Sequence, residues 1–420
     1  MFQRFVLVLI AVCVVFCAGC DGKKPKTAKP SSPASQADGE LPKDESATDP
    51  PVKSAAGSTE LSSDWPMERG NVASSGAYAN SVGDEFEIDW EFKYPKGAFE
   101  SGPIIVTVEG KPTVFVAGID INVHGKIYSI DLESGEANWE FEIKEGFVAA
   151  PAFRDGKLFV GDMAGMIYCV DAKYGKEVWK YETQAQISSS GNFYKSLVLF
   201  GSEDATLYAI DRDSGKLKWS HSIEDQIQCG ATVAGDRCFL AGCDAKLHIV
   251  GLDDGKEIDA IEIGSPTGTT AAAFGDNVFF GTEQGTFFSI DFRNPKINWD
   301  WQEDTTAVSI RSSAAVTETN VVFGARNRRV NCLDPKTGLL KWSAKVKAKV
   351  DGSPVIAGDR VYAGSTDGRL YVLDLLDGEE LWQQQFNGAF LGSPAIIGGE
   401  RPRLVVATER GTVYSLKPVP

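Results

Sequence analysis

Histidine is scarce in this sequence, with three residues among 420: His124, His221 and His248. Their spacing matches no metal-binding motif, and none has a neighbouring Ser or Cys in a nucleophile motif. Each is therefore predicted to be an ordinary surface or strand residue. Asp-Gly pairs occur, but none belongs to the run of alternating oxygen ligands that a calcium loop needs. The sequence thus predicts turns at these pairs, and neither a metal site nor a catalytic centre.

Positive charge is also in short supply. The 42 Lys and Arg are outnumbered by 58 Asp and Glu, which gives a net charge of −16. Phosphate binding needs a basic face, so this balance argues against a nucleic acid partner. It agrees better with solubility in an exported compartment.

No apolar run reaches the length of a spanning helix. The longest candidate, Phe5 to Phe16, follows Arg4 and ends in the small residues before Cys20, which is the pattern of a secretory signal peptide over residues 1–20. The ending Cys-Ala-Gly-Cys resembles the bacterial lipobox, which implies a lipid anchor on Cys20; a cleaved soluble signal is the alternative. Asp21 resembles an inner-membrane retention signal of enteric bacteria, so the choice of membrane stays open.

Residues 21–63 contain few aromatic or β-branched side chains and many Pro, Ser, Ala, Lys and Asp. Such a segment buries too little apolar surface to offset its ordering entropy, so it is predicted to be a disordered tether.

A repeat fills the rest of the chain. Asp211, Gly215 and Trp219 form a signature that recurs as Asp131/Gly135/Trp139, Asp171/Gly175/Trp179, Asp334/Gly338/Trp342 and Asp374/Gly378/Trp382. Two copies are degraded: Asp291/Pro295/Trp299 lacks the Gly, and Gly251/Gly255/Asp259 lacks both the Asp and the Trp. A period near 40 residues with short apolar strands is typical of a β-propeller, in which each repeat is one blade.

The two ends of the repeat region complement each other. Ile88 to Phe92, with Trp90, has the pattern of an outermost strand, like Ala137 to Phe141, but no inner strands precede it. The last repeat stops before its Trp strand. Seven internal repeats and this composite blade therefore predict an all-β, eight-bladed β-propeller of four-stranded antiparallel blades over residues 64–420, closed by an N-terminal strand that removes the exposed edge.

The stretch from Ala209 to Trp219 resembles the tryptophan-docking repeat of PQQ-like propellers. This family includes quinoprotein dehydrogenases and the BamB-like lipoprotein of the outer-membrane β-barrel assembly machinery. The resemblance implies that each Trp stacks on the next blade, and that blade 4 is a weak joint or one where a loop compensates. The docking residues would be Trp90, Trp139, Trp179, Trp219, Trp299, Trp342 and Trp382. The lead-in from Trp65 to Gly76 resembles a family segment that packs across one propeller face.

The resemblance extends to the enzymes only in fold. They carry a vicinal Cys-Cys pair and acidic residues around a calcium-bound quinone, and this chain has no Cys-Cys dipeptide. It is therefore predicted to be no enzyme and to have no cofactor, PQQ included.

Two cysteines form a candidate pair. Cys229 and Cys243 flank a hairpin centred on Asp236 and are predicted to lie opposite each other on adjacent strands. In an exported protein they either form a disulfide or remain two buried thiols. Cys169 and Cys332 are predicted to be small core residues.

Aligning the repeats suggests a binding surface at the mouth of the central channel. Just before each innermost strand lies a mixed ring next to an apolar ring, with the candidates Glu100, Gln228, Arg311, Asp351, Phe99, Phe147 and Phe390. This is the pattern of a recognition funnel, and equally of packing at the inner ends of the blades. The basic turn of Arg326, Arg328 and Arg329 either docks a carboxylate-rich partner or is a solvated loop.

The sequence therefore favours a non-catalytic, monomeric scaffold of the cell envelope, anchored by lipid on the periplasmic side of a bacterial membrane. Its partner would be another envelope protein, with outer-membrane protein assembly as the closest model by resemblance. The alternatives are a quinone- or calcium-dependent oxidoreductase and a glycan- or peptide-binding module.

Overall fold

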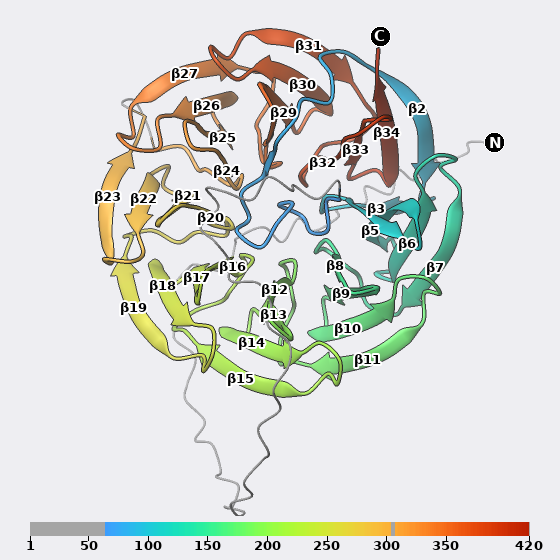
Figure 1. Ribbon diagram of the computed structural model, residues 1–420, viewed down its shortest axis with the longest axis horizontal. Coiled ribbons are helices and arrows are strands. Elements are labelled where there is room, and N and C mark those ends of the chain that lie inside the picture. The colour runs from blue at the N-terminus through green and yellow to red at the C-terminus, as the bar shows by residue number, and fades with distance from the viewer. Residues whose placement is uncertain (1–63, 304–306, 420) are drawn as a thin grey trace, which may run out of the picture. The chain divides into compact units, whose positions relative to one another are not determined.

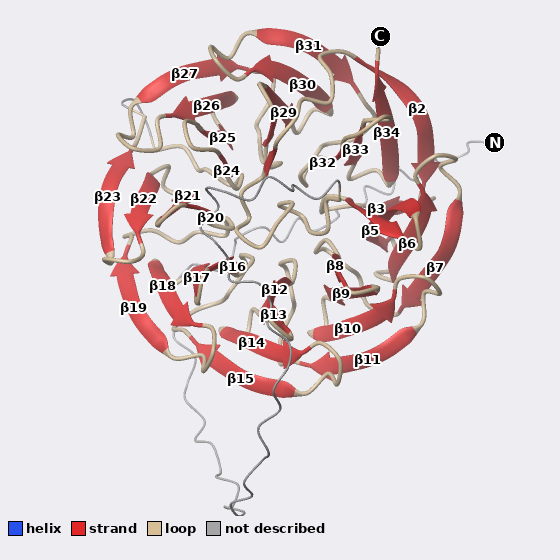
Figure 2. Cartoon of the chain, viewed as in Figure 1, coloured by secondary structure: helices blue, strands red, loops and turns tan. Residues whose placement is uncertain are grey.

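The structure is a computed structural model that describes residues 64–303 and 307–419. The predicted signal peptide with Cys20 and the predicted tether lie outside these residues. The described chain consists of strands, turns and loops (Figure 2). Within this part of the chain, no helix has the length and apolar character needed to cross a membrane.

Eight antiparallel sheets stand in a ring (Figure 1), as the sequence predicts. Blade 1 contains β3 (Gly97–Ala98), β4 (Ile104–Val108), β5 (Lys111–Asp120), β6 (Gly125–Asp131) and β7 (Ala137–Ile143). Blade 2 contains β8 (Ala152–Arg154), β9 (Lys157–Gly161), β10 (Met166–Asp171) and β11 (Glu177–Glu182). Blade 3 contains β12 (Asn192–Tyr194), β13 (Leu197–Gly201), β14 (Thr206–Asp211) and β15 (Leu217–Ser222). Blade 4 contains β16 (Thr232–Ala234), β17 (Arg237–Ala241), β18 (Lys246–Gly251) and β19 (Glu257–Glu262).

The second half of the ring repeats this plan. Blade 5 contains β20 (Ala272–Phe274), β21 (Asn277–Gly281), β22 (Phe287–Asp291) and β23 (Lys296–Trp301). Blade 6 contains β24 (Ala315–Val316), β25 (Val321–Ala325), β26 (Arg329–Leu333) and β27 (Leu340–Lys345). Blade 7 contains β28 (Val355–Ala357), β29 (Arg360–Gly364), β30 (Arg369–Asp374) and β31 (Glu380–Gln385). Blade 8 contains β32 (Ala395–Ile397), β33 (Arg403–Ala407), β34 (Thr412–Pro418) and β2 (Phe86–Lys93). Two sheets gain a short fifth strand: β3 pairs with β5, and β1 (Ala77–Tyr78) runs parallel to β28.

The predicted closure of the ring is confirmed. Strand β2 pairs antiparallel with β34, with Trp90 opposite Ser415 and Phe92 opposite Val413. The N-terminal strand thus completes the sheet that the C-terminal segment begins and covers the edge of β34, as the outermost strand does in the other blades.

The signature residues form one compact turn. The Asp131 carboxylate accepts hydrogen bonds from the backbone N–H groups of Glu133 and Ser134 and from the Ser134 hydroxyl. Gly135 then adopts a φ of +73°, a conformation that costs a residue with a Cβ about 1–2 kcal/mol. The same carboxylate-to-backbone bonds recur at Asp171, Asp211, Asp291 and Asp334.

Each signature Trp joins its blade to the next. In six of the seven, the indole lies over the signature Gly of the following blade and donates a hydrogen bond to a carbonyl of the same turn. These bonds run from Trp90 to Leu132 (2.7 Å), Trp139 to Ala172 (3.1 Å), Trp179 to Arg212 (2.8 Å), Trp219 to Leu252 (3.1 Å), Trp299 to Pro335 (3.0 Å) and Trp342 to Leu375 (2.9 Å). Trp382 faces blade 8, whose outer strand comes from the N-terminus, and packs edge-on against Phe86 with ring centroids 5.8 Å apart.

The joint between blades 4 and 5 lacks its Trp, since Asp259 stands there, and a different side chain replaces it. Arg237 donates to the carbonyl of Phe292, which is the acceptor that the missing indole would have used. Phe292 packs against Phe239, with ring centroids 4.7 Å apart, and Arg293 lies over the Phe292 ring. Arginine and phenylalanine thus compensate at this joint, and Arg237 and Phe239 come from strand β17 rather than from the loop that one sequence-based alternative proposed.

Candidate functional site

The lead-in residues 65–78, called here the axial strap, lie at the centre of the ring (Figure 1). The strap makes backbone hydrogen bonds to the innermost strands of successive blades. The donors are the N–H groups of Ile105, Phe153, Val233, Ala273, Val316 and Ile356, and the acceptors are the carbonyls of Trp65, Pro66, Val72, Ala73, Ser75 and Gly76. The Asn192 side chain of blade 3 also donates to Val72. The strap therefore accepts hydrogen bonds from the edges of the innermost strands, which face the axis of the propeller.

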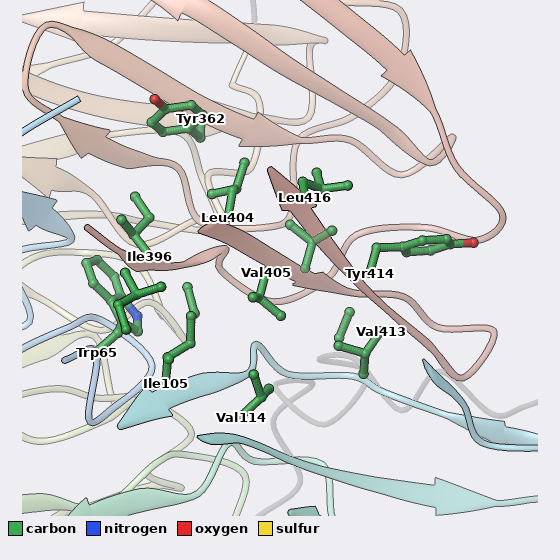
Figure 3. Close-up of a cluster of buried hydrophobic side chains, with 14 of the residues drawn as sticks. Trp65, Ile105, Val114, Tyr362, Ile396, Leu404, Val405, Val413, Tyr414 and Leu416 are labelled. Atoms are coloured by element: carbon green, nitrogen blue, oxygen red, sulfur yellow. The ribbon is translucent and has the colours of Figure 1, made fainter. Parts of the chain in front are cut away.

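Trp65 anchors the start of the strap. It is 1% exposed and belongs to a buried cluster with Ile105, Ile396 and Leu404 from blades 1 and 8 (Figure 3). Burial of a large aromatic side chain contributes several kcal/mol, so the strap is held as firmly as a core element.

Arg69 ties the strap to three blades at once. Its guanidinium donates to the Ser393 hydroxyl (2.7 Å) and to the carbonyls of Ala314 (2.8 Å) and Pro354 (3.0 Å). Burial lowers the pKa of Arg69 to about 10, against the opposing effect of Glu68. Burial likewise raises the pKa of Glu68, which accepts a hydrogen bond from Ser190 (3.1 Å).

A cavity of about 20 Å³ lies between strap residues Met67 to Ser74 and the inner ends of blades 3 to 5. Such a volume holds a water molecule but not an organic cofactor.

The predicted apolar ring is packing rather than a funnel wall. Phe99 and Phe147 are fully buried and Phe390 is 2% exposed. The Phe390 ring fills the space above Gly364, where an added Cβ would lie 2.5 Å from the Phe390 side chain. The three phenylalanines are thus packed within the blades and the joints between them and are not accessible to a ligand in this structure.

The neighbouring ring is mostly polar, and all its members except the exposed Gly268 are half-buried. We call it the polar ring, and the end of the propeller that carries it the polar-ring face; its members are Glu100, Val148, Ser188, Gln228, Gly268, Arg311, Asp351 and Leu391. Three members pair with turns between the second and third strands, and the first is Ser188, whose hydroxyl donates to Glu203. Arg311 contacts Glu283 (3.0 Å), and Asp351 accepts two hydrogen bonds from Arg326 (2.9 and 2.8 Å).

Glu100 and Gln228 have different surroundings. Burial, with the charge of Glu409, raises the pKa of Glu100. The Gln228 amide donates to Gln226 (3.2 Å). The four predicted polar residues thus lie on one face, although Glu283, Arg326 and Glu409 belong to the same group and were not placed there by the alignment.

The three arginines of the basic turn have different surroundings. Arg326 is held by Asp351, and Arg329 lies 3.7 Å from a Glu303 carboxylate oxygen and donates to Ser343 (3.2 Å). Arg328 is exposed, at a φ of +66°. Only Arg328 therefore presents its charge fully to solvent.

The possible Cys229–Cys243 disulfide is not formed among the described residues. The hairpin pairs Thr232 with Phe239 and Val233 with Cys238. If this register is extended toward the axis, Cys229 lies opposite position 242 and not opposite Cys243. Because side chains alternate between the two faces of a sheet, this offset of one residue places the Cys229 and Cys243 side chains on opposite faces. Cys229 instead shares a buried cluster with Cys238, and burial raises its pKa to about 11.

One cluster was missed by reading the sequence. The structure brings His221 of blade 3 and His248 of blade 4 together, with ring centroids 6.2 Å apart and Glu257 beside both. Their separation along the chain equals that of Phe141 and Tyr168, which pack at the joint between blades 1 and 2. Aligning the repeats at these two positions would have revealed the pair.

Comparison with known proteins identifies the family. The sequence model of the protein family described as outer membrane protein assembly factor BamB matches residues 123–309 and 300–419 of this chain. The chain belongs to this family.

A BamB of Yersinia pestis is 26% identical over 153 residues, which are 33% of this chain and 38% of that protein. The chain therefore spans little more than a third of the length of this relative. Among solved structures, BamB from Moraxella catarrhalis has a TM-score of 0.63 at 13% identity, covering 79% of this chain and all of that one. A quinohemoprotein alcohol dehydrogenase from Comamonas testosteroni has a TM-score of 0.70 at 15% identity, covering 85% and 81%.

Both structural matches establish the shared propeller fold. Membership of the BamB family, the strap along the axis and the polar-ring face are the features from which a function can be argued.

Proposed function

We propose that this BamB-family chain is a non-catalytic scaffold of the bacterial envelope that binds a protein partner during outer-membrane protein assembly. It would act as a monomer without a cofactor, exported and held by lipid on Cys20 at the periplasmic side of a membrane. The observation that carries the proposal is the axial strap, which occupies the centre of the ring and leaves the polar-ring face as the surface for recognition.

The charges of this face support a protein partner. Glu283–Arg311 and Arg326–Asp351 fix polar side chains in place, so the surface is ordered before a partner arrives. Arg328 and Lys349 lie exposed beside them on a chain of net charge −16. Local cations on an acidic protein favour an acidic patch on the partner.

The test is affinity capture from solubilised envelope with matched charge reversals. Arg328→Glu with Lys349→Glu changes the polar-ring face, and Lys216→Glu with Lys336→Glu makes the same change in turns on the opposite face. We expect wild type and the second variant to recover an outer-membrane assembly protein, and the first variant to lose it. Equal recovery by both variants would exclude the polar-ring face, and no assembly protein in any sample would exclude the scaffold function.

A quinone-dependent oxidoreductase remains the second candidate, because the dehydrogenase fold covers 85% of this chain. Purified protein with PQQ and Ca²⁺ distinguishes the two. The scaffold function predicts no thermal shift and no dye reduction with alcohols, whereas both together would establish the enzyme.

A further inference from the structure

Three side chains with metal-ligating atoms meet at the joint between blades 3 and 4. They are His221 on β15, His248 on β18 and Glu257 on β19, and one ligand atom from each lies within 4.8 Å of the others. The Glu257 Oε2 atom lies 2.7 Å from His248 Nδ1 and 3.5 Å from His221 Nε2. The cluster thus spans two blades.

At three other joints the same place is built from ordinary aromatic packing. Phe92 packs on Tyr128 (centroids 4.9 Å apart), Phe141 on Tyr168 (5.9 Å), and Tyr181 on Tyr208 (5.8 Å). Only imidazoles, among these pairs, offer nitrogen atoms to a metal. The exchange of both partners for His at one joint therefore changes its chemistry, not its packing.

The nitrogen atoms are arranged as in a metal site. His221 Nε2 is buried and has no hydrogen-bond partner in the described structure. Such an atom carries a desolvation cost that a metal ion would offset. It points into the cluster, within reach of the Glu257 carboxylate.

A second carboxylate holds His248 from behind. Asp244, 2% exposed, lies 2.8 Å from His248 Nε2, so Nδ1 is the nitrogen turned to Glu257 and His221. A carboxylate on the far nitrogen of a ligating imidazole fixes its tautomer and orientation. At the preceding joint the Tyr208 hydroxyl makes the corresponding bond to Asp204 (2.8 Å).

We propose that His221, His248 and Glu257 bind a divalent transition-metal ion of the Zn²⁺ class across this joint, with Asp244 orienting His248. Two imidazoles and a carboxylate suit Zn²⁺, Ni²⁺ or Cu²⁺ and are a poor set for Mg²⁺ or Ca²⁺. Bonds of about 2.0–2.1 Å place tetrahedral ligand atoms roughly 3.3 Å apart. The two imidazole nitrogens are the widest-spaced pair, within 4.8 Å, so they must approach each other when the ion binds. The Glu257 side chain is 41% exposed, and its open side leaves the fourth position to water.

The bound ion would link blade 3 to blade 4. This is a structural role next to the joint that lost its Trp, and it is independent of the proposed partner surface on the polar-ring face.

The repeat supplies a variant that removes the ligands and keeps the packing. His221→Phe with His248→Tyr rebuilds the pair of Phe141 and Tyr168, and the new tyrosine hydroxyl has Asp244 as its acceptor. Zn²⁺ titration of the untagged full-length protein, by calorimetry and thermal shift, should show one site and a rise in Tm. In the double variant both should disappear, with a metal-free Tm equal to that of wild type or higher.

Two further variants separate a real site from adventitious binding. Glu257→Gln should weaken Zn²⁺ at least tenfold, and His124→Phe, at a His remote from the cluster in sequence, should leave it unchanged. An excess of Mg²⁺ should not compete. The proposal is overturned if wild type binds no Zn²⁺, or if the His221/His248 double variant binds it as wild type does.

Discussion

At the scale of single residues, the signature Gly and the Trp of the preceding blade form one unit. Gly378 has a φ of +77°, and an added Cβ would lie 2.6 Å from the Trp342 ring. The contact therefore joins two residues that are 36 positions apart and lie on different blades. Within one repeat, the Asp and Gly belong to the joint with the preceding blade, and the Trp belongs to the joint with the following blade.

This coupling predicts a specific cost for Gly378→Ala. Backbone strain at positive φ contributes about 1–2 kcal/mol, and displacement of Trp342 adds roughly 1–3 kcal/mol. Gly156→Ala is the matched control, because Gly156 has a φ of +74° and nothing within 4 Å of the added Cβ. Thermal unfolding should show a clearly larger loss of Tm for Gly378→Ala. Equal losses would mean that backbone strain alone explains the glycine.

Glu100 predicts a pH dependence of stability. Its pKa is raised from 4.5 by burial and by Glu409, so the folded state favours the protonated form. Stability is therefore highest below the unfolded pKa near 4.5 and is lost as the pH rises through the folded pKa. Glu100→Gln should match wild type at pH 4 and melt at a higher temperature at pH 7. A Tm difference that stays constant over this range would contradict the assignment.

Side-chain direction explains which site residues the sequence could predict. Aligned repeats predicted Phe99 and Glu100 at the channel end, but neighbouring residues point to different sides, and only coordinates show that the Phe is the buried one. Likewise, the pairing of Arg326 with Asp351 joins two successive blades, which a run of three cations does not reveal.

At the scale of elements, the changes in the two degraded repeats meet at one joint, between blades 4 and 5. Asp259 replaces the Trp of blade 4, and Pro295 replaces the Gly of blade 5 on which that Trp would lie. Proline cannot adopt positive φ, so neither residue of this joint is in its usual form. Arg237, where blade 3 has Leu197 at the start of the same strand, supplies the missing hydrogen bond instead.

The effects on Tm of substitutions at Asp259, Pro295 and Arg237 should therefore depend on one another. Asp259→Trp alone should not raise Tm, because the indole finds Pro295 and a carbonyl already bonded to Arg237. Adding Pro295→Gly and Arg237→Leu should raise Tm above that of Asp259→Trp. Arg237→Leu with Pro295→Gly, without the Trp, serves as the control and should fall below wild type. Additive effects across the set would show that the joint is not coupled.

The axial strap was predicted as an element but not in its path. The Trp65 to Gly76 motif indicated packing across a face, whereas the strap follows the innermost strands of seven blades. Local sequence does not encode this path, because most hydrogen bonds between the strap and the blades use backbone groups. The acceptors of the Arg69 side chain, in turn, lie 245 to 324 residues from Arg69 along the chain.

Arg69 is the residue on which that path most depends. Arg69→Met leaves three buried acceptors without a donor and Glu68 without its cation, a loss of about 3–5 kcal/mol. The denaturation midpoint should drop accordingly, while Lys336→Met, at an exposed turn, should stay within about 0.5 kcal/mol of wild type. If Arg69→Met behaved like this control, the strap would not be part of the cooperative core.

At the scale of the whole molecule, the sheet of β2 and β34 decides whether the ring stays closed. The eight-blade count was predictable because the Trp90 strand and the truncated last repeat each lack what the other has. A covalent link at this seam tests its importance. Glu87 lies opposite Lys417, and the two form an ion pair at 3.3 Å.

Glu87→Cys with Lys417→Cys would close a loop of several hundred residues across the seam. Lys126→Cys with Glu142→Cys is the matched control, since it replaces an opposed Lys–Glu pair (3.0 Å) within blade 1 and closes a loop of only about 16 residues. Loop-closure entropy predicts about 3 kcal/mol for the short loop and about 5 kcal/mol or more for the long one. Comparing oxidised with reduced protein, each variant being its own reference, should therefore give the larger rise in denaturation midpoint for the seam. Equal rises would mean that unfolding begins elsewhere, with blade 8 still paired, and that the ring opens at a joint between blades before its ends separate.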